Sequence, residues 1–296
     1  MKPLTPADRP ARLTVGVISA GRVGAVLGAA LSRAGHRVAA VAAVSDASRR
    51  RADALLPDVA IRPAEQVAAG ADLLVLAVPD DALASMVGGL ASADAVRRGT
   101  LVMHTSGAHG IRILDPLTER GGLPLALHPV MTFTGTDVDL QRLDGACFGV
   151  TSDEVLRPVA ETLVIEMGGE PSWIAEELRP LYHAGLAFGA NHLVTLVAQS
   201  ADLLAAAGVE VPARMLGPLL GAALDNALRS GDRALTGPVA RGDAGTVLTH
   251  LSTLASRAPE SVDAYVAMAR LTAARALAAG LLDVEAAAAL LDVLAT

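Results

Sequence analysis

The hydrophobic pattern changes character near residue 175. Before that point, short apolar runs typical of buried strands alternate with amphipathic segments typical of helices. The predicted strands are 13–18, 36–44, 71–78, 100–104 and 123–128, with a short one inside 57–63 and two more at 148–151 and 170–174. The predicted helices are 25–31, 48–56, 64–69, 81–90 and 154–167. This alternation predicts an α/β fold with a doubly wound parallel sheet and right-handed crossovers.

Beyond Ala175 the strand signals disappear and alanine- and leucine-rich helical segments follow. We predict helices at 176–207, 212–230, 243–256, 259–279 and 284–294, separated by glycine-containing breaks. A chain of 296 residues is long for one hydrophobic core and suits two domains. We therefore predict a flexible tail at 1–12, an α/β domain at 13–174 and an all-helical domain at 175–296.

The first of these predicted helices has two possible environments, membrane or soluble domain, because Pro180 to Ala201 contains no Asp, Glu, Lys or Arg. A stretch of that length can span a bilayer. It also holds His183, Asn191 and Gln199, which a membrane span would bury at a cost. We predict a helix of a soluble domain, buried on most of its sides, and no membrane partner.

A glycine turn follows the first predicted strand and precedes a helix. Gly21 would let the backbone approach a pyrophosphate, and Gly24 would let the helix lie close to the strand. The helix N-terminus would offer N–H groups to the phosphates. Ser19 stands where such fingerprints usually begin with glycine. We predict that the segment Ser19, Ala20, Gly21, Arg22, Val23 and Gly24 binds a dinucleotide; the alternative is an ordinary strand–helix unit.

Other predicted strands end in polar or turn residues that would line the same crevice, since ligands of parallel sheets bind at the carboxyl ends of strands. After the second strand, Asp46 would favour NAD, whereas Ser45, Ser48 and Arg49 to Arg51 would favour the 2′-phosphate of NADP. We expect NADP and expect one or two of these arginines to face water. The further predicted cofactor contacts are Val78, Pro79, Asp80, Thr105 and Ser106.

Histidine is the side chain best suited to proton transfer near neutral pH. His104 and His128 end strands beside the crevice, where they would contact substrate or nicotinamide, or else stabilise turns. His183 shares a helix face with Asn191, so this pair would protonate and orient a carbonyl oxygen. The alternative is a buried polar pair. His36 precedes a strand and is expected at the surface.

Composition excludes several functions. The net charge of −7 and an aromatic content of 2% argue against a nucleic-acid partner. Cys147 is the single cysteine, which rules out an internal disulfide and fits a reducing, cytoplasmic location. The histidines lack metal-ligand spacing, so no metal is expected. Lys2 is the only lysine and lies in the predicted tail, which excludes a mechanism that needs a buried lysine.

Several motifs together resemble one bacterial family, a Rossmann-like domain followed by a DUF2520 domain within the 6-phosphogluconate dehydrogenase-like superfamily. The resemblance covers nearly the whole chain after the tail. The motifs are Ile18 to Gly24, Ala77 to Asp81, His104 to Ala108, His128-Pro129 with Phe133, Arg179 to Ala184, Asn191-His192, and Thr236 to Pro238 with Arg241 to Asp243.

The resemblance implies an NADP-binding domain, a helical domain that dimerises, and similarity to ketopantoate and pyrroline-5-carboxylate reductases. In related reductases a lysine four residues before an asparagine donates the proton; here Ala187 stands four residues before Asn191. His183 or a crevice histidine would then replace it, with Tyr182 and Arg241 as substrate contacts. Ketopantoate is the expected substrate, because such genes often adjoin those of pantothenate synthesis. The alternatives are an imine or amino-acid-type reductase and a non-catalytic NADP-binding sensor.

Overall fold

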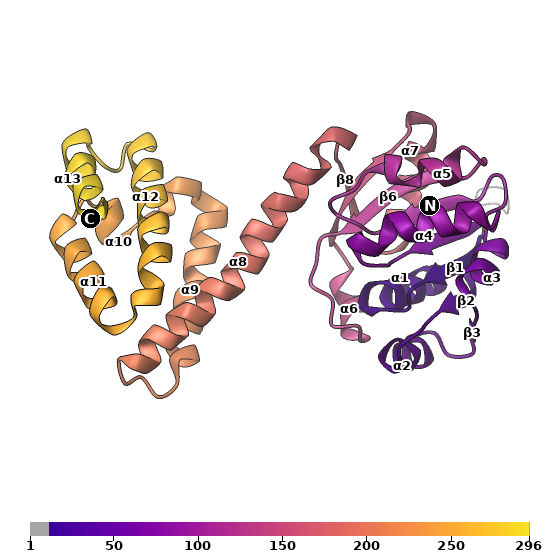
Figure 1. Cartoon of the computed structure of the whole chain (residues 1–296), viewed down its shortest axis with the longest axis horizontal. Helices are drawn as coiled ribbons and strands as arrows, with labels where there is room; N and C mark the ends of the chain where they lie inside the picture. Colours follow the sequence, from indigo (N-terminus) through magenta and orange to yellow (C-terminus); the bar gives the residue numbers. More distant parts are fainter. Residues whose placement is uncertain (1–11, 296) are drawn as a thin grey trace, which may run out of the picture. The chain divides into compact units, whose positions relative to one another are not determined.

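The computed structural model describes residues 12–295, which form two compact units that divide between Gly189 and Ala190 inside the long helix α8 (Figure 1). The predicted boundary at 174/175 lies at the end of the last strand. Apart from Arg12, the predicted tail at 1–12 lies outside the described residues.

The first unit contains a sheet of eight strands in the order β3-β2-β1-β4-β5-β6-β7-β8. Their bounds are β1 Thr14–Ile18, β2 Arg37–Ala42, β3 Ala60–Ile61, β4 Leu73–Leu76, β5 Leu101–His104, β6 Leu123–Pro129, β7 Cys147–Ser152 and β8 Glu170–Trp173.

Helices connect these strands and cover both faces of the sheet. Their bounds are α1 Arg22–Arg33, α2 Asp46–Leu55, α3 Ala64–Ala69, α4 Asp80–Ser92, α5 Asp115–Thr118, α6 Val138–Arg142 and α7 Arg157–Glu166, with 3-10 turns η2 Ile111–Leu114, η3 Glu154–Leu156 and η4 Glu176–Leu178.

The two faces of the sheet contact different helices. Val15 and Val17 of β1 belong to a core shared with α1, α2 and α7. Leu74 and Leu76 of β4 belong to a second core shared with α3, α4 and α5. A central strand is therefore buried on both sides, which explains why such strands read as continuous apolar runs in the sequence.

The sheet is parallel from β3 to β6, as predicted, but β7 runs antiparallel to β6 and β8 is parallel to β7. The predicted parallel sheet is confirmed from β3 to β6, and the antiparallel pairing of β6 with β7 departs from it at this edge. The backbone N–H of Val130, just after β6, donates to the carbonyl of Cys147 at the start of β7. The chain thus re-enters the sheet at the edge it has just left, and a strand that starts there runs in the opposite direction.

The second unit is helical, as predicted. It contains the later part of α8 (Arg179–Ala206), then α9 Pro212–Ser230, α10 Gly237–Ala240, α11 Ala244–Arg257, α12 Val262–Ala278 and α13 Val284–Leu294, with 3-10 turns η5 Gly231–Ala234 and η6 Pro259–Ser261. The buried core of this unit lies among α10 to α13 and is rich in alanine.

Helix α8 differs from its prediction. Arg179, its first residue, is the one residue of α8 that is buried, whereas Phe188 and Val194 are 59% and 70% exposed. The helix was expected to be covered on most sides, and within a single chain it is not. Among the described residues, no helix is long and apolar enough to cross a membrane.

Candidate active site

The glycine turn after β1 has the geometry of a nucleotide-binding turn. Ser19 adopts φ +75°, the left-handed region that glycine occupies more readily. A Cβ on Gly24 would lie 2.1 Å from the carbonyl oxygen of Ser19 and 3.0 Å from Cβ of Ala77, so no larger residue fits. The N–H groups of Ser19 and Ala20 donate to the carbonyl of Ala42, which fixes the turn against β2.

Helix α1 starts at this turn with Gly21 as its N-cap and without a side-chain cap. A Cβ on Gly21 would approach nothing closer than the hydroxyl of Ser19, at 3.4 Å, so the space beside this residue is open. Ala20 and Gly24 are buried, while Arg22 is exposed. The first N–H groups of α1 thus face an uncrowded turn, the arrangement that accepts a phosphate.

A cavity of about 850 Å³ adjoins the turn. Arg49 and Arg51 line it, whereas Arg50 and Asp46 are not among its lining residues. Arg62, just after β3, lines it as well and was not predicted. The predicted residues among its lining are Ser19, Gly21, Ser45, Ser48, Arg49 and Val78.

Ser45 and Ser48 hold the start of α2 in place beside these arginines. The hydroxyl of Ser45 accepts the backbone N–H of Ser48 at 3.1 Å, and the hydroxyl of Ser48 donates to the carbonyl of Ser45 at 2.7 Å. This N-cap positions the end of β2 against the cavity. Arginine side chains at a helix N-terminus form a site for an anion.

The turn after β5 is closed by its own side chains. The hydroxyl of Ser106 accepts from the N–H groups of Ala108 and His109, both at 3.2 Å, and the N–H of Thr105 donates to the carbonyl of Leu76. After β4, Pro79 and Asp80 are exposed at the start of α4.

His104 is fully buried and both of its ring nitrogens are engaged. Nδ1 accepts the N–H of Ser106 at 3.2 Å, so Nε2 carries the proton and donates to the carbonyl of Gly110 at 2.8 Å. Burial lowers the pKa of His104 to about 4. These contacts favour the turn-stabilising alternative for this residue.

His128 and His183 come together over Gly107. Their ring centroids are 6.0 Å apart with the planes at 84°. A Cβ on Gly107 would lie 2.7 Å from Cδ2 of His183 and 3.0 Å from Nε2 of His128. The hydrogen atoms of Gly107 therefore leave room for both imidazoles at the carboxyl ends of β5 and β6.

Tyr182 supports His128 from the side away from Gly107. Its hydroxyl lies 2.8 Å from Nδ1 of His128, with the rings edge to face at 5.7 Å. A Cβ on Gly149 of β7 would lie only 2.3 Å from this hydroxyl. A glycine on β7 thus admits the tyrosine, which contacts the histidine rather than open space.

Arg179 is fully buried, and its Cζ lies 5.8 Å from the ring centroid of Tyr182. Its Nη1 donates to the carbonyl of Gly149 at 3.3 Å, while its Nε and Nη2 have no hydrogen-bond partner in the part of the chain that the structure describes. Burial, followed by the charge of Arg179 and the proximity of His183, lowers the pKa of His128 to about 4, with an opposing effect of Asp80. His128 is therefore a neutral imidazole at pH 7.

Asn191 and Arg241 belong to the second unit, where both are exposed. The crevice histidines His104, His128 and His183 belong to the first unit. The proposed contacts of Asn191 and Arg241 with substrate stay predictions.

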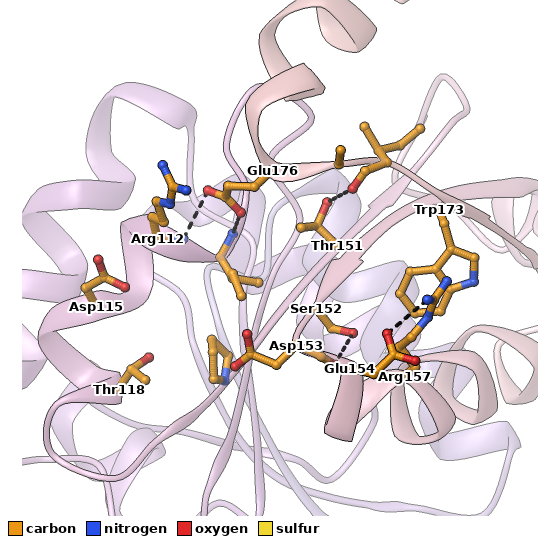
Figure 2. A pocket seen from close by; sticks show the side chains of 14 residues that line it. Arg112, Asp115, Thr118, Thr151, Ser152, Asp153, Glu154, Arg157, Trp173 and Glu176 are labelled. Atoms are coloured by element: carbon orange, nitrogen blue, oxygen red, sulfur yellow. Dashed lines mark hydrogen bonds and ion pairs between the residues drawn. The ribbon is translucent and has the colours of Figure 1, made fainter.

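A second cavity of the first unit, of about 600 Å³, contains none of the predicted site residues (Figure 2). Glu176 reaches across it and accepts from the N–H groups of Ile111 and Arg112 at 2.7 and 3.3 Å. Arg157 pairs with Glu154 and lies 4.1 Å from the ring centroid of Trp173. The first set of contacts joins η4 to η2, and the second joins α7 to η3 and β8.

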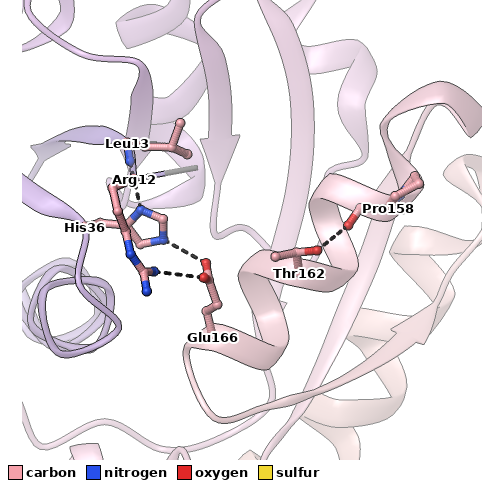
Figure 3. Close-up of polar contacts among 6 residues, drawn as sticks. All are labelled: Arg12, Leu13, His36, Pro158, Thr162 and Glu166. Atoms are coloured by element: carbon pink, nitrogen blue, oxygen red, sulfur yellow. Dashed lines mark hydrogen bonds and ion pairs between the residues drawn. The ribbon is translucent and has the colours of Figure 1, made fainter. Parts of the chain in front are cut away.

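His36, expected at the surface, is 4% exposed, so that expectation was wrong (Figure 3). Its Nδ1 accepts the N–H of Leu13 at 3.1 Å, and its Nε2 therefore donates to Glu166 at 2.8 Å. Arg12 pairs with the same carboxylate at 3.1 Å. The amide at the start of β1 needs an acceptor, and His36 supplies it while linking β2 to α7.

Sequence reasoning missed Arg62 and the role of Arg179. The place of Arg62 after a strand at the same edge of the sheet was a usable signal. No pattern in the sequence separates a buried arginine at a helix start from an exposed one, since arginine is ordinarily a surface residue.

A strand, a glycine turn and a helix at the carboxyl edge of a mostly parallel sheet define a Rossmann-type fold. The sequence matches two family models in this order: a Rossmann-like domain at residues 2–129 and a domain of unknown function, DUF2520, at residues 146–272. The chain therefore combines a Rossmann-like N-terminal domain with a DUF2520 domain.

Solved structures with the same fold include a proposed NADP oxidoreductase from Bacteroides fragilis, with a TM-score of 0.72, 21% identity, and coverage of 88% of this chain and 98% of that one. An imine reductase from Pseudomonas sp. has a TM-score of 0.65 at 21% identity, covering 96% and 99%. The pyrroline carboxylate reductase of Plasmodium falciparum, with NADP bound, has a TM-score of 0.53 at 13% identity, covering 89% and 98%. At these identities the likeness establishes the fold. No curated protein matches the chain.

Proposed function

We propose that the protein is an NADP-dependent oxidoreductase that reduces a small carbonyl acid, with ketopantoate, which becomes pantoate, as the particular substrate. The observation that carries this proposal is the glycine turn of Ser19 to Gly24 beside an arginine-lined cavity. The fold neighbours named as NADP oxidoreductase, imine reductase and NADP-bound pyrroline carboxylate reductase support the same class.

The residues present fit NADP better than NAD. The open turn at Gly21 would take the pyrophosphate, and Arg49, Arg51 and Arg62 would hold the 2′-phosphate beside the start of α2. Asp46, the residue that would favour the ribose of NAD, is not among the residues lining the cavity.

When bound, NADPH supplies a hydride to the carbonyl carbon, and the carbonyl oxygen must gain a proton to give the alcohol. His183, half-buried beside Gly107, is the group that we assign to this proton. His128, neutral at pH 7, holds the oxygen by a hydrogen bond. His104 acts within the fold, because both of its nitrogens are occupied. Asn191 would orient the substrate and Arg241 would bind its carboxylate.

The first experiment follows NADPH absorbance with purified protein and ketopantoate, with NADH in parallel. We expect decay with NADPH and much slower decay with NADH. No decay with either nucleotide, together with measured NADPH binding, would reject the substrate and leave a different acid or a non-catalytic binding protein.

Three neighbouring arginines provide a matched test of the cofactor. Arg51→Ala and Arg62→Ala should each raise the KM for NADPH by about tenfold and leave the KM for NADH unchanged, because each removes one charge beside the 2′-phosphate. Arg50→Ala is the control, since Arg50 is exposed and does not line the cavity. Equal effects of all three substitutions would contradict this placement of the phosphate.

We also propose that the helical region joins two copies of the chain into a homodimer. Helices α8 and α9 expose large apolar side chains along their length: Leu181, Phe188, Leu193, Val194, Leu196, Met215, Leu219, Leu224 and Leu228. So many exposed large apolar side chains on two helices are typical of an interface. A second copy carries the same surface, so a two-fold contact would cover both at once.

Light scattering after gel filtration tests the dimer. We expect twice the chain mass for the wild type and a shift toward monomer for Leu224→Glu together with Leu228→Glu, because buried carboxylates oppose association. Val155→Glu is the control, since Val155 is 87% exposed and belongs to η3 of the first unit rather than to α8 or α9. A monomeric wild type at micromolar concentration would contradict the proposal.

A further inference from the structure

The chain contains two tyrosine–histidine pairs, and one of them adjoins the predicted site. In the pair Tyr182–His128, the hydroxyl lies 2.8 Å from Nδ1 of the imidazole. A phenol oxygen is donor and acceptor at once, and each nitrogen of a neutral imidazole has one role or the other. The contact therefore selects which ring nitrogen of His128 carries the proton.

The surroundings of Tyr182 favour one direction for this bond. Burial raises the pKa of Tyr182, so the hydroxyl keeps its proton. Among the described residues, the hydrogen bond that the structure gives this hydroxyl is the 2.8 Å contact with Nδ1 of His128, so donation from Nδ1 would leave the phenol O–H without an acceptor. The O–H therefore donates to Nδ1 of His128, which places the imidazole proton on Nε2.

Nε2 of His128 is the atom that faces the predicted reaction space. It lies 3.0 Å from where a Cβ on Gly107 would stand, beside Cδ2 of His183. We propose that Tyr182 is a positioning residue that holds His128 as the neutral Nε2–H form, and that this N–H binds a carbonyl oxygen rather than a protonated imine. The proposal rests on the proposed reductase function and names the substrate class.

The charges near Tyr182 and His128 also favour a carbonyl substrate over a protonated imine. Hydride addition makes a carbonyl oxygen negative, whereas a protonated imine arrives positive and presents an N–H of its own. Arg179 is a fully buried cation whose Nε and Nη2 have no hydrogen-bond partner among residues 12–295. Of the nearby carboxylates, Asp80 is exposed, and Glu176 accepts from the backbone at Ile111 and Arg112. Because burial reduces screening, the arginine favours the carbonyl.

The direct test is ¹⁵N NMR of the protein labelled in its histidines, at pH 7 and without ligands. Comparison with His128→Gln assigns the signals of His128. We expect an unprotonated Nδ1 and a protonated Nε2. Tyr182→Phe should convert this pattern to a mixture of both neutral forms. The control is Tyr265→Phe, because Tyr265 makes the same 2.8 Å contact with His250 in the second unit; it should leave His128 unchanged.

Turnover gives the second readout. With NADPH, ketopantoate should be reduced at least tenfold faster than 1-pyrroline-2-carboxylate, and Tyr182→Phe should lower kcat for ketopantoate about tenfold with little change in the KM for NADPH. A protonated Nδ1, an imidazolium at pH 7, an unchanged spectrum in Tyr182→Phe, or faster reduction of the imine would each overturn the proposal. Turnover of neither compound would reject the proposed substrates, while the ¹⁵N spectrum would still decide the role of Tyr182.

Discussion

The two tyrosine–histidine pairs have nearly the same geometry and different surroundings. In both, a tyrosine hydroxyl lies 2.8 Å from a histidine Nδ1, and the rings meet edge to face at 5.7 and 5.8 Å. His250 is exposed on α11, whereas His128 lies against buried Arg179, Gly107 and a second imidazole. A contact of this kind is therefore not a site by itself. Partial burial and the nearby charge of Arg179 distinguish the pair Tyr182–His128 from the exposed pair.

The largest expected effect comes from closing the space beside the buried pair. Gly107→Ala would set a Cβ 2.7 Å from His183 and 3.0 Å from His128, so both rings must move. We expect kcat/KM with ketopantoate to fall at least about a hundredfold, since misplacement by an ångström has this scale of effect. The free energy of unfolding should fall by about 1–3 kcal/mol.

Gly88→Ala in α4 is the control for this substitution, because nothing lies within 4 Å of its Cβ position. It should keep full activity and gain slightly in stability, as alanine favours helix over glycine. Wild-type turnover in Gly107→Ala would contradict the proposed roles of His128 and His183 in the reaction.

A smaller effect follows from the lowered pKa values of buried His104 and half-buried His128. His104 and His128 each have a pKa of about 4 in the folded protein and about 6.5 when unfolded. Between these values the unfolded chain binds more protons, so stability is full above pH 6.5 and is lost as the pH falls toward 4. At pH 5 each histidine should account for a loss of about 2 kcal/mol.

Urea unfolding at pH 7 and pH 5 measures this loss. His128→Gln should be less stable than the wild type at pH 7 and should lose about 2 kcal/mol less between the two pH values, because glutamine has no proton to gain. An identical loss in both proteins would mean that His128 is protonated in the fold as readily as in the unfolded chain.

The sequence predicted backbone features of the site better than it predicted the surroundings of side chains. The β1 turn was predictable because apolar runs and glycines have direct backbone consequences, and Ser19 with φ +75° takes the glycine-like conformation expected at that position. Arg49 and the strand ends followed from the rule that ligands meet the carboxyl edge of a parallel sheet. The reversal at β7 was not predictable, since an isolated apolar run does not reveal its direction.

Side-chain surroundings were the least predictable part of the site. His104 and His128 both end strands in the sequence, yet His104 closes a turn whereas His128 contacts a tyrosine. His36, which precedes a strand, links β2 to Glu166 of α7 rather than facing water. The burial of Arg179 was not predicted, because this first residue of α8 is covered by contact with β7, about 30 residues earlier in the sequence. Burial of a polar group is a property of the assembled fold.

Double-mutant cycles provide the finest comparison, with the smallest expected effect at the exposed pair. The cycle of Tyr265→Phe with His250→Ala should give a coupling free energy below about 0.5 kcal/mol, because water replaces a surface hydrogen bond at little cost. The cycle of Tyr182→Phe with His128→Ala should give about 1–2 kcal/mol, since the remaining buried partner would be left unsatisfied. Equal coupling free energies at the two pairs would mean that solvent reaches both alike. The surroundings of Tyr182 and His128 would then give this pair no chemical property that Tyr265 and His250 lack.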